Sequence, residues 1–432
     1  MEKRGKEKRL VMEMRGREIG EKKEKEGEEE KEEEEGDDGR KDIFCDIFSF
    51  SLCLVSKRHK VEAFEEIRGS TVCPHPASLG GLCVLCGKQE VDGSAVPFGY
   101  VLKALKIGSQ ELARLRRANL KSLLQKKKLY LVLDLDHTLL NSTRFRDISP
   151  DEGFLMNQTD SLEDIPKGSL FKLDSMCMLT KLRPFVRTFL KEASDMFEMY
   201  IYTMGEQSYA LEMARLLDPE EVYFNSKVIS QSDCTQRHQK GLDIIMGADN
   251  AVVILDDTES VWSKHKENLI LMERYHFFAS SGRHFGLNYK SLSELSRDEV
   301  ESEGAVSAIL KVLKRVHQSF FNSDNKDNLL GRDVRLSLDM FRSPSELAQG
   351  IRTFGSEVLG ERLMAEQLGA KCTTECNQSV THVVSLEAGT DKAHWAWKRG
   401  KFLVHPRWIE AENYFWKRQP EEAFELEPPK KP

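Results

Sequence analysis

The sequence predicts an α/β protein built on a parallel sheet, followed by a second, smaller α/β unit. Three observations predict this fold class. Apolar, strand-like runs alternate with amphipathic helical stretches from residue 128 to about 289. Two of these runs end abruptly in closely spaced aspartates, and the same alternation resumes on a smaller scale over the last hundred residues. A chain of 432 residues is also too long for one compact domain.

The composition excludes several classes of protein. Charged residues make up 31% of the chain and the net charge is -7, which disfavours direct binding of nucleic acid. The best candidate for a membrane span, 43–55, is too short and carries Asp46. The nine cysteines have irregular spacing and follow no export signal, so we expect a reducing compartment and no disulfide framework.

The chain divides into segments of different character. Residues 1–40 hold 12 Lys/Arg and 16 Asp/Glu, too many charges to bury a core, so this part is expected to be disordered. A helical pattern covers 110–128, and another within 301–328 runs into a polar linker. We predict these segments: a disordered charged tail (1–60), a Cys/His-containing region (61–119), the main α/β domain (120–300), a helical linker (301–328), the smaller α/β domain (329–424) and a tail (425–432).

The most informative pattern is acidic. The apolar run Leu129–Leu133 is followed by Asp134 and Asp136, and the run 251–255 is followed by Asp256 and Asp257. Ligands of an open α/β sheet collect at the carboxyl ends of its strands. Carboxylates gathered there repel one another unless a cation lies between them. Such oxygen-rich clusters suit Mg²⁺, so the sequence predicts a magnesium site.

Two further residues lie between the acidic pairs. Thr203 follows the apolar run 199–202 and precedes Gly205, a pattern that lets backbone N–H groups approach an anion. Lys240 stands before Gly241 at the predicted start of a helical stretch and offers a cation. Neither residue is informative alone, but their order between the aspartates is.

This order, Asp-x-Asp-x-Thr, then Thr, then Lys, then Asp-Asp, resembles the haloacid-dehalogenase (HAD) phosphotransferase superfamily. The segments DLDHTLLNST, TKLRPFVRTFL, MYIYTMG and VVILDDTESVW resemble the TFIIF-associating phosphatases of the C-terminal domain (CTD) of RNA polymerase II, and among them the plant CTD-phosphatase-like proteins. The resemblance implies a HAD-like Rossmannoid sheet over 120–300. The insertion between Leu140 and Leu179 is short and polar, so we expect a small cap or none, and an open site that suits a peptide.

The resemblance also implies roles for the acidic residues. Asp134 would be the nucleophile that forms an aspartyl phosphate. Asp136 would protonate the leaving serine oxygen and later deprotonate the attacking water. Mg²⁺ would be held by Asp134, the backbone carbonyl of Asp136 and Asp257, while Asp256 would orient a metal-bound water or Lys240.

Three other side chains would serve the substrate. By the same resemblance, Thr203 and Lys240 hold the phosphoryl oxygens. Arg183, in the KLRP run, is a candidate second cation for the phosphate, with a structural role at a helix start as its alternative.

A Cys/His cluster precedes the main domain. Cys73, His75, Cys83 and Cys86 supply the ligands of a tetrahedral Cys₃His zinc site within fourteen residues. Two interpretations remain open: a structural Zn²⁺ that staples a small loop, and reduced cysteines without metal. Neither is catalytic.

The smaller domain has its own pattern. We expect a strand over Val334–Leu338, a helix over 357–368 ending at Gly369, a short strand, a strand at 381–384, a helix over 391–399, a strand over 402–404 and a last helix with Trp408 in the core. The runs THVV and HWAWKRGKFLVHPRWIEA resemble a BRCT domain, which implies a protein-docking role.

Together the resemblance implies a nuclear, Mg²⁺-dependent protein serine/threonine phosphatase of the RNA polymerase II CTD that regulates transcription. Its partners would be the phosphorylated CTD of the largest polymerase subunit and, through the BRCT domain, TFIIF. Two alternatives remain: a HAD phosphatase of another phosphoprotein, and an inactive scaffold that binds phosphoserine.

Overall fold

The computed structural model describes most of the chain from residue 73 onwards. The described residues are 73–89, 93–165, 167–285, 290–322, 329–342, 352–354, 362, 364–366, 368–416 and 418–426. The predicted charged tail (1–60), the polar linker and the extreme C-terminal residues lie outside them, as does most of the helix expected over 357–368. Among the described helices, none is long and apolar enough to cross a membrane.

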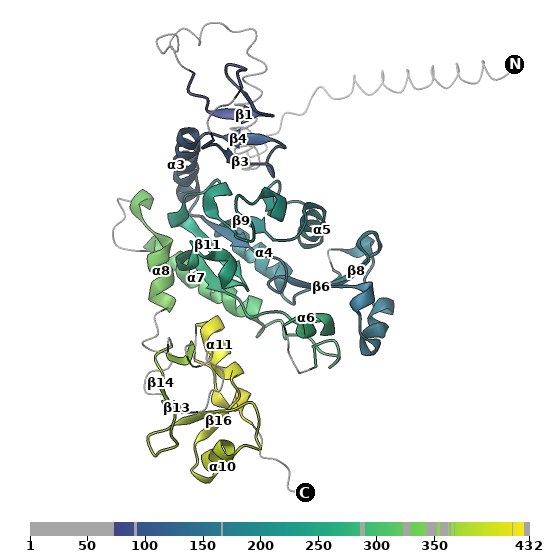
Figure 1. The fold of residues 1–432 in the computed structure, drawn as a ribbon, viewed down its shortest axis with the longest axis vertical. Coiled ribbons are helices and arrows are strands. Elements are labelled where there is room, and N and C mark those ends of the chain that lie inside the picture. The colour runs from purple at the N-terminus through teal and green to yellow at the C-terminus, as the bar shows by residue number, and fades with distance from the viewer. Residues whose placement is uncertain are drawn as a thin grey trace, which may run out of the picture. The chain divides into compact units, whose positions relative to one another are not determined.

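A five-stranded parallel sheet forms the centre of the main domain (Figure 1). Its strand order is β10-β9-β5-β11-β12. The strands are β5 (Leu129–Leu133), β9 (Phe197–Tyr202), β10 (Val228–Ile229), β11 (Val252–Asp256) and β12 (Leu269–Leu271). Every residue of β5 and β11 is buried, as continuous apolar runs in a parallel sheet should be. The predicted α/β class and its three principal strands are therefore confirmed.

Amphipathic helices supply the apolar residues that cover the sheet. Leu120 and Leu124 of one helix and Phe189 and Leu190 of another join the strands in one large cluster of buried residues. The helices of the domain are α3 (Ser109–Gln125), α4 (Val186–Ser194), α5 (Gln207–Leu217), α6 (Ala279–His284), α7 (Ala305–Asn322) and α8 (Val334–Arg342).

The expected strand over Val334–Leu338 is wrong, because these residues begin helix α8. Val334, Leu336 and Leu338 alternate as in a strand, which explains the prediction. In the structure Val334 and Leu338 are buried in the main core, whereas Leu336 is 71% exposed. Burial thus follows the four-residue spacing of a helix and not the two-residue spacing of a strand.

The insertion after β5 forms a small antiparallel sheet. Its order is β6-β8-β7, with β6 (Leu140–Arg144), β7 (Leu170–Leu173) and β8 (Met178–Leu182). A separate cluster that includes Leu155, Leu170 and Leu179 buries one face with Tyr275 and Phe278 from the main domain. The expected small cap is thus a structured sheet, although its core is shared with the main domain.

Two further sheets flank this domain in the sequence. An antiparallel sheet of order β2-β1-β4-β3 precedes it, with β1 (Ala77–Leu79), β2 (Leu82–Cys83), β3 (Val96–Pro97) and β4 (Leu105–Ile107). A parallel sheet of order β14-β13-β15-β16 follows it, with β13 (Arg352–Phe354), β14 (Lys371–Thr373), β15 (His382–Val384) and β16 (Phe402–Val404).

The C-terminal sheet carries the predicted helices α10 (Asp391–Lys398) and α11 (Arg407–Phe415). Trp408 is 1% exposed, which confirms its expected place in the core. The first strand of this sheet is β13, a segment that the sequence pattern did not reveal.

Candidate active site

The polar residues of the site stand at the carboxyl ends of three neighbouring strands. Leu133 of β5 pairs with Ile201 of β9 on one side and with Leu255 of β11 on the other. Asp134, Thr203 and Asp256 therefore emerge at one edge of the sheet, as the sequence predicted from the strand ends. The N–H of Asp134 donates to the carbonyl of Leu255 at 2.9 Å, which fixes where its side chain begins.

Lys240 joins two of the aspartates. Its Nζ lies 2.5 Å from Oδ1 of Asp134 and 2.6 Å from Oδ2 of Asp256. All three side chains are buried. Burial alone would lower the pKa of Lys240, but the two carboxylates outweigh it, so the pKa lies above its ordinary value. Lys240 is therefore a permanent cation inside the cluster.

The Lys240 backbone differs from the expectation. A helical stretch was predicted to start there, but only the short 3₁₀ turn Leu242–Ile244 follows. The N–H of Lys240 donates to the carbonyl of Val261 at 2.8 Å. Lys240 reaches the aspartates from this loop and lies 5.7 Å from the ring centroids of both Tyr202 and Trp262.

Asp256 accepts three hydrogen bonds from the protein. Besides Lys240, its Oδ2 accepts from Nε1 of Trp262 at 2.8 Å, and its Oδ1 accepts from the N–H of Thr258 at the same distance. A carboxylate held in this way suits the orienting role better than a place in the metal's coordination shell.

Asp257 faces a second cation. Its Oδ2 accepts from Nε of Arg274 at 2.6 Å and from Oγ1 of Thr258 at 3.0 Å. One ligand oxygen from each of Asp134, Asp256 and Asp257 lies within 4.8 Å of the others. Three buried carboxylates this close leave a negative site whose oxygen donors fit Mg²⁺.

Electrostatics also favour a cation at this position. Burial raises the pKa of Asp134 well above its ordinary value, and Asp256 raises it further while Lys240 opposes both. The remaining oxygen of Asp134, Oδ2, accepts only a long bond of 3.2 Å from Thr138 among the described residues. A divalent ion would therefore stabilise the ionised form of Asp134 and meet an oxygen that has capacity left.

Asp136 has a different neighbour. Its Oδ1 accepts from the Tyr209 hydroxyl at 2.6 Å, and that hydroxyl lies 2.9 Å from Oγ of Ser142. Burial raises the pKa of Asp136, against the opposing effects of Tyr209 and His137. The side chain is thus held apart from the three clustered carboxylates and is biased towards its protonated form.

Thr203 places its hydroxyl in the turn that follows β9. Its Oγ1 accepts from the N–H of Gly205 at 3.0 Å. A Cβ on Gly205 would lie 2.8 Å from Tyr209, so this close approach requires glycine. The predicted Thr-x-Gly turn is therefore present beside the site.

Arg183 is engaged by partners within the protein. Its guanidinium forms a bidentate pair with Glu299 at 2.7 and 3.0 Å and donates to the carbonyls of Thr138 and Glu273. The side chain is buried and packs over Tyr275. These donors hold the loop after Asp136 and agree with the structural alternative, and the substrate role of Arg183 stays a prediction.

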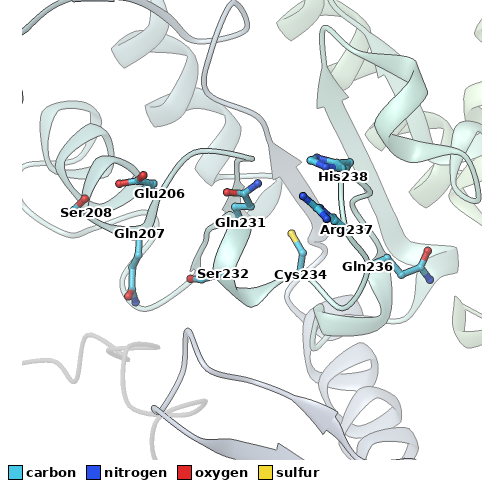
Figure 2. Close-up of a pocket in the computed structure, with 9 residues that line it drawn as sticks. All are labelled: Glu206, Gln207, Ser208, Gln231, Ser232, Cys234, Gln236, Arg237 and His238. Atoms are coloured by element: carbon cyan, nitrogen blue, oxygen red, sulfur yellow. The ribbon is translucent and has the colours of Figure 1, made fainter.

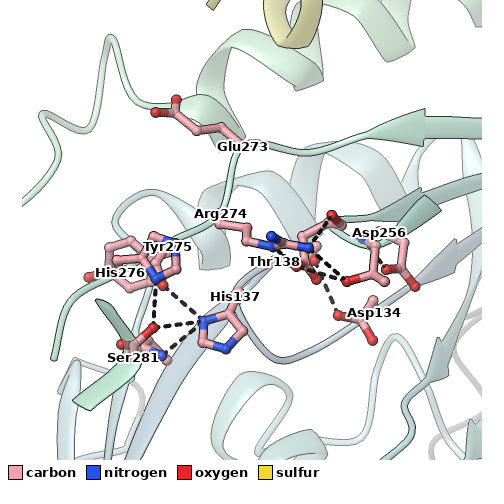
Figure 3. Close-up of polar contacts among 12 residues, drawn as sticks. Asp134, His137, Thr138, Asp256, Glu273, Arg274, Tyr275, His276 and Ser281 are labelled. Atoms are coloured by element: carbon pink, nitrogen blue, oxygen red, sulfur yellow. Dashed lines mark hydrogen bonds and ion pairs between the residues drawn. The ribbon is translucent and has the colours of Figure 1, made fainter. Parts of the chain in front are cut away.

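Sequence reasoning missed several residues that shape the site. They contact the predicted residues: Tyr209, Trp262, Arg274 and the group His137, Ser281 and His276. Nδ1 of His137 lies 3.2 Å from Oγ of Ser281, which is 2.6 Å from Nδ1 of His276 (Figure 3). Tyr209 lies 73 residues from Asp136 and Arg274 lies 17 from Asp257, whereas Trp262 lies only six residues from Asp256, within the quoted segment VVILDDTESVW.

The structure has a pocket of about 690 Å³. Its lining residues are close in sequence to Thr203 and Lys240. It is lined by residues after β9 and β10, and Figure 2 shows Arg237 and His238 on one side and Glu206 and Ser208 on the other. Its walls are thus polar and carry both signs of charge.

The predicted zinc ligands also come together. One donor atom of each of Cys73, His75, Cys83 and Cys86 lies within 4.8 Å of the others. This cluster belongs to the N-terminal antiparallel sheet.

Comparison with known families supports two domains. Residues 129–303 match the NLI interacting factor-like phosphatase family. Residues 361–408 match the twin BRCT domain family.

The chain is also similar to individual proteins. It is 50% identical to RNA polymerase II C-terminal domain phosphatase-like 4 of Arabidopsis thaliana over 388 residues, which cover 87% of each chain. It is 40% identical to phosphatase-like 3 of the same organism over 76% of this chain and 27% of that one.

A solved structure of Fcp1, described as an essential RNA polymerase II CTD phosphatase, shares the fold with a TM-score of 0.54. It is 24% identical and covers 73% of this chain and 100% of its own. The similarity to phosphatase-like 4 over 87% of each chain, together with the phosphatase domain and the acidic site, settles the family. This chain belongs to the RNA polymerase II C-terminal domain phosphatase-like family of protein phosphatases.

Proposed function

We propose that this chain dephosphorylates serine or threonine in the heptad repeats of the RNA polymerase II CTD, through an aspartyl phosphate on Asp134 and with Mg²⁺ bound. The observation that carries this proposal is the meeting of Asp134, Asp257 and Lys240 at one sheet edge, with Asp136 two residues beyond the nucleophile. The names of its relatives supply the substrate.

In the first step an oxygen of Asp134 attacks phosphorus, and the bond from phosphorus to the serine oxygen breaks. Asp136 donates its proton to that leaving oxygen. The raised pKa of Asp136 favours the protonated form that this role needs, and Tyr209 holds the carboxyl in place.

In the second step Asp136 accepts a proton from water, which attacks the phosphorus of the aspartyl phosphate. Inorganic phosphate leaves and Asp134 is restored. Lys240 and the Thr203 hydroxyl hold the phosphoryl oxygens, and Asp256 keeps Lys240 aimed at Asp134.

Magnesium fits the donor set. Asp134, Asp257 and the backbone carbonyl of Asp136 would hold it, since Asp256 is already engaged by Lys240 and Trp262. When bound, the ion neutralises phosphoryl oxygens in the transition state.

The rest of the chain suits a long, flexible substrate. The pocket with Arg237 and His238 offers a place for residues that flank the phosphoserine. The BRCT domain would tether the enzyme near its substrate, with TFIIF as a candidate partner, and so raise the effective concentration of weakly bound repeats. These roles imply a nuclear protein that regulates transcription. We propose that its domains have the boundaries predicted from the sequence.

The test is phosphate release from a panel of phosphopeptides. Heptad peptides phosphorylated at different serines are compared with an unrelated phosphopeptide of equal charge, each with Mg²⁺ and with EDTA. We expect release from heptad peptides only with Mg²⁺. Faster release from the unrelated peptide would contradict the proposed CTD substrate. Full activity in EDTA would contradict the proposed need for Mg²⁺.

A further inference from the structure

The Cys/His cluster has the dimensions of a metal site. Sγ of Cys73 lies 3.9 Å from Sγ of Cys83, and Sγ of Cys86 lies 3.8 Å from Nδ1 of His75. Zinc bonds of about 2.3 Å to sulfur and 2.0 Å to nitrogen place tetrahedral donors roughly 3.5–3.8 Å apart. A disulfide would need about 2.05 Å between the sulfurs, and all three cysteines are free.

The backbone between Cys83 and Cys86 forms a tight turn that keeps the two residues close. The N–H of Leu85 points at Sγ of Cys83 from 3.4 Å, and the N–H of Gly87 donates to the carbonyl of Cys83 at 2.9 Å. Gly87 has a φ of 70°, a region that glycine enters without strain. The turn therefore holds two potential ligands three residues apart, a spacing typical of structural zinc sites.

The sheet that carries the cluster has little core of its own at this end. Strands β1 and β2 have three and two residues. Leu79 and Leu82, at the turn between them, are 42% and 53% exposed. Burial of so little apolar surface cannot offset the entropy of ordering the turn, so a metal is the natural source of its stability.

The same sheet supports the loop that follows Lys240. The N–H of Gly108, at the start of α3, donates to the carbonyl of Pro76 at 2.8 Å, next to the ligand His75. From this region the Tyr100 hydroxyl donates to the carbonyl of Ile244 at 2.8 Å. Nη2 of Arg116 donates to the carbonyl of Leu242 at 2.7 Å.

We propose that Cys73, His75, Cys83 and Cys86 bind one structural Zn²⁺, which fixes the N-terminal sheet so that it can hold the loop after Lys240. Three thiolates and an imidazole select zinc over magnesium or calcium, which prefer oxygen. The four protein ligands fill a tetrahedral shell and leave no open position for chemistry.

The binding test measures metal in the full-length protein expressed with added zinc. We expect about one tightly held zinc per chain, released when a mercurial reagent titrates the thiols. Replacement by cobalt should give tetrahedral d–d bands and thiolate-to-cobalt charge-transfer absorption. A wild-type protein without zinc and without that absorption would overturn the proposal.

The variant test compares Cys86→Ser with Cys177→Ser, a change at an exposed cysteine outside the cluster. Zinc content should fall about tenfold or more in Cys86→Ser and stay unchanged in Cys177→Ser. Equal zinc in both variants would contradict the assigned ligands.

A third measurement covers the case in which Cys86→Ser misfolds. Removing zinc from the wild type with a strong chelator should speed proteolytic cleavage within 73–107, and added zinc should reverse this. Unchanged cleavage would reject the structural role. None of these readouts requires phosphatase substrate, so they are independent of the proposed function.

Discussion

The two clusters of metal-ligating residues are built in opposite ways. Asp134, Asp256 and Asp257 are buried at the ends of long core strands, and the protein already supplies them with Lys240 and Arg274. Of the four Cys/His residues only Cys83 lies in a strand, the two-residue β2, and Cys86 is exposed. The first cluster is therefore held in place by the fold, whereas the second, on our proposal, would depend on a zinc ion for local order.

This difference separates catalysis from stability. Loss of Mg²⁺ from the acidic site should remove activity and leave the fold, because protein cations still offset part of the charge. Loss of zinc should loosen the N-terminal sheet first and affect activity only through the loop after Lys240.

The largest expected effect is that of Asp134→Asn. Without the nucleophile, Mg²⁺-dependent hydrolysis of an aryl phosphate should fall about 10³-fold or more. The thermal unfolding midpoint should stay within a few degrees, because the change removes a buried negative charge and keeps the shape. The contrast between the acidic cluster and the Cys/His cluster would be contradicted if Asp134→Asn unfolded while Cys86→Ser lost only activity.

Lys240→Ala should affect both properties. It removes the cation that holds Asp134 and Asp256, so kcat should fall about 10²-fold or more, and unfolding should become easier by roughly 3–5 kcal/mol. Added Mg²⁺ should restore part of the stability. Chemical denaturation with and without Mg²⁺ measures the change in the free energy of unfolding.

Lys314→Ala is the matched control for this experiment. Lys314 pairs with Glu192 at 2.6 Å, but the two side chains are 51% and 39% exposed, so its loss should cost about 1 kcal/mol or less. Equal losses for both variants would show that the buried triad has no special role.

Arg183→Lys tests the structural role of Arg183. A lysine cannot reproduce the bidentate pair with Glu299 and the carbonyl contacts, so stability should fall by about 2–4 kcal/mol. Inhibition by inorganic phosphate should not change. If the variant had normal stability but were inhibited more weakly by phosphate, Arg183 would instead be a ligand of the substrate phosphate.

The smallest expected effect concerns Glu412, a buried carboxyl in the BRCT domain. It is 1% exposed, and its Oε1 has no hydrogen-bond partner among the described residues. Burial raises its pKa to about 7. The stability that its protonated form contributes is complete below the unfolded pKa, near 4.5, and is lost as the pH rises through 7.

Glu412→Gln should therefore stabilise the domain by about 1–2 kcal/mol at pH 8 and have little effect near pH 4.5. Tryptophan fluorescence of the full chain measures the unfolding of this domain, since four of its five tryptophans lie in 395–416. A pH-independent difference between the variant and the wild type would contradict the raised pKa.

The sequence predicted best those elements whose apolar pattern fits only one type of secondary structure. Continuous apolar runs ending in acids gave β5 and β11 and placed Asp134 beside Asp256. The run Val334–Leu338 misled because its apolar residues fit both periods, and tertiary packing selected the helical one. Strand β13 was missed because its three residues carry no periodic signal.

The site shows the same division. The order of the motifs and the family resemblance brought Asp134, Asp257 and Lys240 into one prediction. They did not reveal Tyr209 or Arg274, whose contacts depend on how separate segments pack. A basic residue such as Arg183 can serve the substrate or the loop, and its contacts to Glu299 agree with the structural alternative.

The most direct test of the central claim is chemical trapping at Asp134. Borohydride reduces an aspartyl phosphate to homoserine, which mass spectrometry locates in a peptide. After a rapid quench during turnover with Mg²⁺, we predict homoserine at position 134 and none in Asp134→Asn. Active turnover with unmodified Asp134 under conditions that trap a control acyl phosphate would contradict the account.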